Sequence, residues 1–295
     1  MNPGLVYAAL AYTAWGLFPI FFKQLTNVAA IEVVMHRTVW SLAFLLVVLA
    51  YRRHWAWLGT VLRSPRLLGA FALSALLLAV NWCTYIWAVQ NAHVLDASLG
   101  YFILPLVSVA LGYGFLKERP RPGQWLAVAV AAAGVLWLTV QAGRLPWVAL
   151  LLAGTFGFYG LLRKVGALGA LEGLTLETLV LSPFAVIALA YLASQGQGAL
   201  LHADVATHAW LLLAGPLTAV PLLLFAAGAR RVTLATMGLL QYIAPTMQLL
   251  MGVWLYGETF GGPRVVGFGL IWGALVVYSL EGWWNRHFIS KIHAK

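Results

Sequence analysis

The sequence GYFILPLVSVALGYGFLKE at residues 100–118 returns, in altered form, as LQYIAPTMQLLMGVWLYGE at residues 240–258. The two stretches align without a gap. Pro105 then matches Pro245, Phe102 matches Tyr242, and Glu118 matches Glu258, each pair 140 residues apart. Because proline and glutamate are uncommon in apolar helices, their coincidence makes chance similarity between leucine-rich segments a poor explanation. The match predicts a chain built from a duplicated unit.

Two further alignments extend the duplication over most of the chain. The segment WGLFPIFFK (15–23) aligns with FGFYGLLRK (156–164), and AIEVVMHRT (30–38) aligns with ALEGLTLET (170–178). We therefore predict one repeat at residues 3–142, a second at residues 145–281, and a cytoplasmic tail at residues 282–295.

The composition is that of an integral membrane protein. Of the 295 residues, 62% are hydrophobic and only 9% are charged, which excludes an ordinary soluble domain, a disordered chain and a coiled coil. A helix needs about 20 apolar residues to cross a hydrocarbon core roughly 30 Å thick. We predict an all-α integral membrane protein with ten transmembrane helices, near 3–22, 31–51, 67–89, 98–116, 124–142, 146–162, 172–193, 209–228, 234–256 and 264–281.

The loop charges predict how the two halves are oriented. Each half has five spans, so the second half must enter the membrane upside down relative to the first. With both termini in the cytoplasm, 14 of the 18 Lys and Arg residues lie on the cytoplasmic side and three lie on the other, while Arg37 lies inside the second span. The net charge of +10 is then explained by topology, so it does not indicate nucleic-acid binding.

The motifs resemble those of a known family. The segments WGLFPIFFK, EVVMHR (32–37), FLKERPRPGQW (115–125), QYIAPTMQLLMGV (241–253) and, most specifically, NWCTYIWAVQNAHVLDASLGYFILPL (81–106) are similar to the RarD-type EamA transporters of the drug/metabolite transporter superfamily. The resemblance implies two inverted five-helix EamA units in the bacterial inner (cytoplasmic) membrane. It also implies a permease that exports small metabolites by alternating access.

Two ionisable residues are predicted inside the membrane. Arg37 lies about six residues inside the second span, and its repeat counterpart is Glu177. One hypothesis is that Arg37 binds a carboxylate or phosphate of the substrate, or pairs with Glu177 in one gating state. The alternative is a local ion pair near the headgroups, because Glu32 precedes His36 by four residues and Arg37 by five. The sequence shows no obvious cation near Glu177 that would explain a carboxylate inside the membrane, which favours a functional role over a structural one. Glu177 is therefore the first residue to test for proton coupling.

Aromatic and amide side chains in the spans are the second predicted set of substrate-binding residues. A wide aromatic pocket with a few amides suits amphipathic or aromatic metabolites. Against this, Trp and Tyr are ordinary at membrane interfaces, and amides often bond between helices. The matched prolines Pro105 and Pro245 are hinge candidates or fixed kinks. Besides His36, Arg37 and Glu177, the predicted binding residues are Trp15, Asn81, Trp82, Tyr85, Tyr101, Tyr159, Gln241 and Tyr242.

These patterns predict a secondary transporter of small organic metabolites or drug-like solutes, with export the expected direction. A channel-like facilitator and an uptake permease for amino acids or vitamins remain alternatives. The chain has no GxxxxGK[ST], GxSxG or HExxH motif, so we expect neither ATP drive nor an enzyme, and no catalytic residues, metal site or cofactor. The expected partners are the lipid bilayer, a small-molecule substrate and, as a coupling ion, protons.

Overall fold

The computed structural model describes residues 2–90, 94–143, 147–256 and 262–284, and these residues form helices and no strands. The all-α class predicted from the sequence is confirmed for them. The helices are α1 (Pro3–Gly16), α2 (Phe18–Lys23), α3 (Ala30–Arg52), α4 (Ala56–Leu62), α5 (Pro65–Gln90), α6 (Val94–Leu116), α7 (Pro122–Ala142), α8 (Trp147–Val165), α9 (Ala170–Ser194), α10 (Ala199–His202), α11 (Val205–Ala229), α12 (Leu234–Leu240), α13 (Ile243–Tyr256) and α14 (Pro263–Trp284).

Several helix ends follow directly from local sequence. The side chains of Asn2, Asp204 and Thr233 accept hydrogen bonds from the first turns of α1, α11 and α12, which satisfies backbone N–H groups that lack an intrahelical partner. Pro122 stands in the first turn of α7, where its missing N–H costs nothing. Gly143 ends the same helix with φ +70°, a conformation that a side chain would disfavour.

The fold is that of a multi-pass membrane protein. Within the described ranges, eight helical segments are long and apolar enough to cross a bilayer, and α6 adds a shorter apolar stretch, Gly100–Leu116. Large apolar side chains such as Val47, Phe184 and Trp254 lie on the outside of the protein, each more than two-thirds exposed. Contact between such an apolar surface and lipid is favourable, whereas its exposure to water would be unfavourable.

Two predicted spans are not continuous helices. The predicted span 3–22 is divided at Leu17 into α1 and α2, and the predicted span 234–256 is divided at Gln241 and Tyr242 into α12 and α13. Each break precedes a proline, Pro19 or Pro245, which has no N–H to donate to the carbonyl four residues earlier. The breaks therefore follow from residues that the hydropathy pattern counts only as part of an apolar run.

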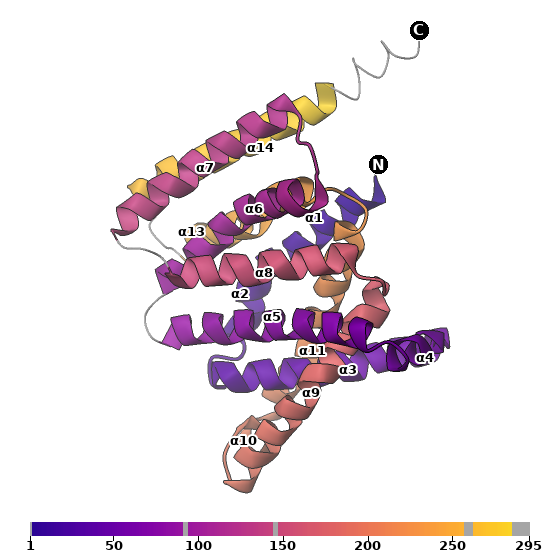
Figure 1. Cartoon of the computed structure of the whole chain (residues 1–295). Helices are drawn as coiled ribbons and strands as arrows, with labels where there is room; N and C mark the ends of the chain where they lie inside the picture. Colours follow the sequence, from indigo (N-terminus) through magenta and orange to yellow (C-terminus); the bar gives the residue numbers. More distant parts are fainter. Residues whose placement is uncertain (1, 91–93, 144–146, 257–261, 285–295) are drawn as a thin grey trace.

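The helices pack in pairs that join distant parts of the chain (Figure 1). Helix α7 lies along α14 at one side of the molecule, while α6 packs against α8 and α12. Helix α11 contacts α1 and α3, and α5 contacts α8 and α9. Helices α3 and α9 also contact each other, as do α1 and α13. Residues from the two predicted halves thus share one core.

Glycines permit the closest of these crossings. At Gly238 in α12, an added Cβ atom would lie 2.6 Å from the carbonyl oxygen of Pro105 in α6. Only a residue without a side chain fits there, because such an approach is well inside van der Waals contact. The crossing holds the broken helix α12–α13 against the first half of the chain.

Candidate functional site

The structure brings four of the predicted binding residues into one group around Arg37. The guanidinium carbon of Arg37 in α3 lies 4.3 Å from the ring centroid of Trp82 in α5. Tyr85 from α5 and Tyr101 from α6 are within electrostatic range of the same guanidinium, and their rings are 6.2 Å apart. We refer to Arg37, Trp82, Tyr85 and Tyr101 as the arginine group.

His36 belongs to a separate pair. Its Nε2 lies 3.7 Å from Oε1 of Glu32, one helical turn earlier, and both side chains are buried. The same carboxylate oxygen accepts a hydrogen bond of 2.6 Å from the backbone N–H of Ala199 at the start of α10. The Glu32 carboxylate considered as a local partner therefore lies beside His36, and neither a hydrogen bond nor an ion pair joins it to Arg37.

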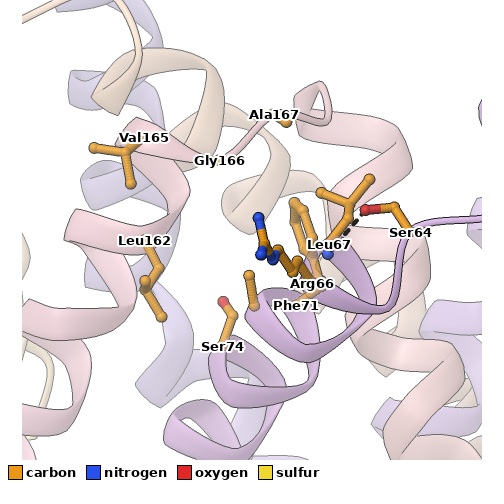
Figure 2. A pocket seen from close by; sticks show the side chains of 10 residues that line it. Ser64, Arg66, Leu67, Phe71, Ser74, Leu162, Val165, Gly166 and Ala167 are labelled. Carbon is orange, nitrogen blue, oxygen red and sulfur yellow. Dashed lines mark hydrogen bonds between the residues drawn. The ribbon is translucent and has the colours of Figure 1, made fainter. Parts of the chain in front are cut away.

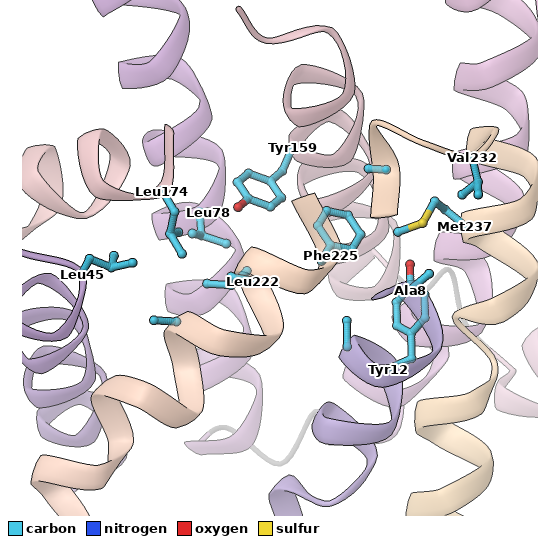
Figure 3. Packing of buried hydrophobic residues seen from close by; sticks show 13 residues of the cluster. Ala8, Tyr12, Leu45, Leu78, Tyr159, Leu174, Leu222, Phe225, Val232 and Met237 are labelled. Carbon is cyan, nitrogen blue, oxygen red and sulfur yellow. The ribbon is translucent and has the colours of Figure 1, made fainter. Parts of the chain in front are cut away.

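Trp15 and Tyr159 belong to a cluster of aromatic rings in the core shared by the two halves, and Figure 3 shows its members Tyr12, Tyr159 and Phe225. Trp15 in α1 lies 5.7 Å from the ring centroids of Tyr12, Phe156 and Phe225. Tyr159 in α8 stacks on Phe225 in α11, with centroids 6.0 Å apart and planes inclined by 14°. We refer to these five residues as the aromatic cluster. Trp82 packs against the same core, so the arginine group is continuous with it.

Glu177 has a partner that the sequence analysis missed. Its side chain is fully buried, and its Oε1 lies 3.4 Å from Nη1 of Arg163 in the last turn of α8. Ser74 donates a hydrogen bond of 2.6 Å to the same oxygen, and the Tyr159 hydroxyl donates one of 3.3 Å to the other. The expectation that Glu177 lacks a local cation is wrong. It pairs with Arg163, and Arg37 interacts elsewhere.

Arg163 is not the loop cation that the charge count assumed. Helix α8 extends past the predicted end of its span to Val165, which places Arg163 inside the fold at 2% exposure. Its Nη2 donates to the carbonyl oxygens of Gly169 and Ala170, and its guanidinium lies 5.6 Å from the ring centroid of Phe71. A buried pair of this kind is stable only when both ions have further partners.

A cavity of about 360 Å³ reaches this charge network (Figure 2). Its walls come from the first turns of α5, including Arg66 and Phe71, and from the end of α8 around Val165. Ser74, the donor to Glu177, is among the lining residues. Ser74 therefore contacts both the buried carboxylate and the cavity.

Asn81 forms bonds between helices. Its Nδ2 donates to the carbonyl oxygen of Leu152 at 2.9 Å and to the hydroxyl of Thr155 at 3.0 Å. These contacts tie α5 to α8, which is the structural alternative raised for amides in the spans. The amide nitrogen of Asn81 is therefore already hydrogen-bonded to α8.

Gln241 and Tyr242 lie where α12 ends and α13 begins. Gln241 is buried at the break, and Tyr242 packs with Phe102 and Phe268 in a separate apolar core. The Tyr242 hydroxyl donates to the carbonyl oxygen of Phe102 at 3.1 Å. Phe102 and Tyr242 are the residues that the repeat alignment matches, so matched positions touch each other.

The hinge candidates occupy different settings. Pro245 lies in the first turn of α13, directly after the break, whereas Pro105 lies inside the continuous helix α6. Pro19 was not predicted to be a hinge, but the helix break that precedes it makes the backbone carbonyl of Trp15 available for hydrogen bonding. Because Pro19 has no N–H, the carbonyl of Trp15 is free, and Nε2 of Gln248 donates to it at 3.2 Å.

A second polar network joins the halves at the same end of α8, through the residue that follows Arg163. Glu118 accepts a hydrogen bond of 3.0 Å from the backbone N–H of Leu234, at the start of α12, and lies 3.4 Å from Nζ of Lys164. Lys164 also donates to the carbonyls of Ala229 and Val232. The repeat alignment marked Glu118 and Lys164, but only the fold shows that they meet. Glu258, the counterpart of Glu118, lies outside the described residues.

This chemistry suits binding more than catalysis. The arginine group, the aromatic cluster and Glu177 together provide a cation, several ring faces and a buried carboxylate. Apolar surface with a few polar groups is typical of small-molecule binding sites. Within the described part of the chain, no group of three or more His, Cys, Asp or Glu residues could hold a metal ion. Fold and site together define a polytopic helical membrane protein with a mixed aromatic and ionic interior.

Comparisons with known proteins identify the family. Residues 2–140 match the model of the EamA-like transporter family. An uncharacterised transporter of Pseudomonas aeruginosa is 46% identical over 96% of this chain and 95% of its own, and protein RarD of Escherichia coli is 42% identical over 98% and 97%. The chloramphenicol-sensitive protein RarD of P. aeruginosa is 32% identical over 98% and 96%. The chain therefore belongs to the EamA-like transporter family, in its RarD group, and is a membrane transporter.

The fold is also seen in a solved structure. A crystal structure with a TM-score of 0.71 covers 94% of this chain and 97% of its own at 18% identity. At that identity the likeness concerns the arrangement of helices alone.

Proposed function

We propose that the protein is a secondary transporter that exports small organic metabolites or drug-like solutes by alternating access. The observation that carries this proposal is the position of the aromatic cluster. It lies between helices of both predicted halves and beside the helix break at Leu17. It is also next to the buried Glu177–Arg163 pair, which Tyr159 contacts, and to Trp82, which lies under Arg37. Secondary transporters bind their substrates at such interfaces between repeats, where broken helices expose backbone polar groups.

The inverted repeat is supported by which helices touch. Exchanging each span with its counterpart turns the contact α1–α11 into α8–α5, and turns α3–α11 into α9–α5; all four contacts are present. The contact α6–α8 likewise becomes α13–α1, which is also present. Matched residues meet at two places, Phe102 with Tyr242 and Trp15 with Phe156. This pattern fits ten spans in two inverted halves, residues 3–142 and 145–281.

The proposal includes an orientation. The excess of Lys and Arg in alternate loops favours cytoplasmic termini, and the bacterial relatives favour the inner membrane. The Lys164–Glu118 network then lies at the cytoplasmic end, where it holds the two halves together and acts as an inner gate in this state.

Glu177 is the residue that we propose for proton coupling. It is the fully buried carboxylate next to the aromatic cluster, reached by Tyr159 from one side and by Ser74 and its cavity from the other. Protonation of Glu177 would remove its negative charge and weaken its pairing with Arg163. Because Arg163 belongs to α8, a helix of the central interface, this change could alter how α8 packs. Buried carboxylates near water-accessible cavities serve this role in many transporters.

Counterflow in liposomes tests the proposed function. Purified protein is reconstituted in vesicles loaded with one unlabelled compound at a time, drawn from amino acids, nucleobases, vitamins and amphenicols; the last class is suggested by the name of the P. aeruginosa relative. A secondary transporter gives transient, saturable uptake of the labelled form of its own substrate. Conductance without saturation would instead support a channel-like facilitator, and vesicles that exchange none of these compounds would count against the proposal.

A further inference from the structure

Within the described part of the chain, Arg37 has no carboxylate as a partner. The described carboxylates are engaged with other partners, and neither a hydrogen bond nor an ion pair joins the Arg37 guanidinium to another described residue. Its Nε is fully buried without a hydrogen-bond partner. The engaged carboxylates are Glu32 with His36, Glu118 with Lys164, Glu172 with His54, Glu177 with Arg163, Asp204 with Thr207 and Glu281 with Arg121.

The contacts that Arg37 does make leave its donors available. A guanidinium over an aromatic face is attracted through the ring's quadrupole, and its N–H groups remain around the edge of the plane. A guanidinium carries five such donors and accepts no hydrogen bond. In a membrane interior, a set of unused cationic donors is costly unless an acceptor from outside the protein satisfies them.

The neighbours of Arg37 fit an anion. Tyr85 and Tyr101 interact electrostatically with the guanidinium and pack with their ring centroids 6.2 Å apart, and each carries a hydroxyl that can donate to an oxyanion. Trp82 fixes the guanidinium from one side and packs on the core that contains the aromatic cluster. A charged head bound at Arg37 would therefore place an apolar or aromatic body against Trp15 and Phe156.

We propose that the arginine group is an anion subsite, and that the transported solute is an amphipathic organic anion with a carboxylate or phosphate head. This inference rests on the proposed transport function, because it names the substrate class of the same site. Arg37 takes two oxygens of the head in the paired geometry that guanidinium groups offer to carboxylates and phosphates. The ring faces of the aromatic cluster take the body.

Arg231 provides a matched control. Its guanidinium lies over the ring of Tyr7 at 5.3 Å, in the same kind of contact, but its Nη1 already donates to the carbonyl of Ala227 and the residue is exposed. Replacing Arg231 removes a cation–aromatic contact and one positive charge without touching the proposed subsite.

The test measures thermal stabilisation of the purified protein by paired probes. The anions are indole-3-acetate, 4-hydroxybenzoate and phenyl phosphate; indole-3-acetamide and 4-hydroxybenzamide are neutral partners of the first two. A ligand that binds the folded state raises its Tm in a concentration-dependent way. We expect at least one carboxylate to bind at least tenfold more tightly than its amide. Arg37→Gln should weaken that anion at least tenfold and leave the amide within twofold, Arg37→Lys should fall between, and Arg231→Gln should match the unchanged protein.

Two outcomes overturn the inference: no anion stabilises the protein, or each amide binds as tightly as its carboxylate. Because the second comparison uses the unchanged protein, it holds even if Arg37→Gln misfolds. Counterflow separates the two proposals. If the vesicles exchange a neutral solute while no anion binds, the subsite is refuted and the transporter stands. If an anion binds through Arg37 but never crosses, the transport function is refuted and the subsite stands.

Discussion

At the scale of single residues, the decisive feature is how buried charge is distributed. Glu177 and Arg163 form a pair with Ser74 and Tyr159, whereas among the described residues the Arg37 guanidinium lies over the ring of Trp82. The first arrangement stabilises the fold while both partners remain charged, and the second keeps cationic donors ready for a ligand. The buried Arg163 and the half-buried Arg37 thus have different roles because their surroundings differ.

Glu177→Gln should destabilise the protein strongly. It leaves the buried Arg163 without a counter-ion, and breaking a buried pair in this way costs about 3–5 kcal/mol. The matched control is Glu172→Gln in the same helix, whose partner His54 is largely exposed, and for such a pair we expect a loss of about 0–1 kcal/mol. Unfolding by denaturant in mild detergent measures both.

The double variant Glu177→Gln with Arg163→Met completes the cycle. If the two residues stabilise each other, the double variant should lose less stability than the sum of the two single losses, because no unpaired charge remains buried. Equal losses for Glu177→Gln and Glu172→Gln, or strict additivity in the double variant, would show that the Glu177–Arg163 pair carries no special energy.

At the scale of helices, the interrupted spans set the geometry of the site. The break after Gly16 frees the Trp15 carbonyl, which Gln248 of the other half captures, and the break at Gln241 turns α12 so that Gly238 can lie against Pro105. Both breaks come from a proline early in the second segment. The first contact links two broken helices to each other across the repeat interface, and the second links α12 to the continuous helix α6.

Restoring the helices should impair movement more than folding. Pro19→Ala and Pro245→Ala supply the missing N–H groups, so α1 with α2, and α12 with α13, can continue as single helices. We expect counterflow to fall at least tenfold while the Tm changes by only a few degrees. Pro183→Ala is the matched control, because Pro183 lies inside the unbroken helix α9. Full activity in both break variants would remove the breaks from the mechanism.

Sequence predicts the elements far better than their contacts. Hydropathy locates the long helices to within a few residues, because a span must bury its backbone and show lipid an apolar face. It cannot reveal that Arg163, at the edge of an apolar run, turns inward to meet Glu177. The repeat alignment singled out Glu118, Lys164, Phe102 and Tyr242, yet their meeting depends on helix crossings that no local pattern encodes. Trp82, Tyr85 and Tyr101 were predicted as binding residues because they are aromatic side chains within spans, and only the fold shows that they lie around Arg37.

At the scale of the whole molecule, the account depends on two halves that cross the membrane in opposite directions. Several contacts between helices have a counterpart when the halves are exchanged, so we expect the chain to allow a second, related packing. Such a pair of packings is what alternating access requires, because one opens each side of the membrane in turn.

The proposed topology has a direct test. Cys83 is the single cysteine, so Cys83→Ser gives a background without thiols. New cysteines at Gln24 and Gln197, in loops after α2 and α9, should react with an impermeant maleimide in intact cells. Cysteines at Arg53 and Arg119 should react only after the membrane is permeabilised. Labelling of Gln24 and Gln197 on opposite sides would contradict the inverted arrangement.

The most direct measurement of alternating access uses spin-label pairs in the same Cys83→Ser background. One pair joins Arg119 and Val165 at the proposed cytoplasmic end, and the other joins Gln24 and Gln197 at the outer end, each pair spanning the two halves. Distances are measured by electron paramagnetic resonance in liposomes, with and without a compound identified by counterflow. The account predicts opposite changes, so that one end opens as the other closes. Parallel changes at both ends, or rigid distances in a protein that transports, would contradict it.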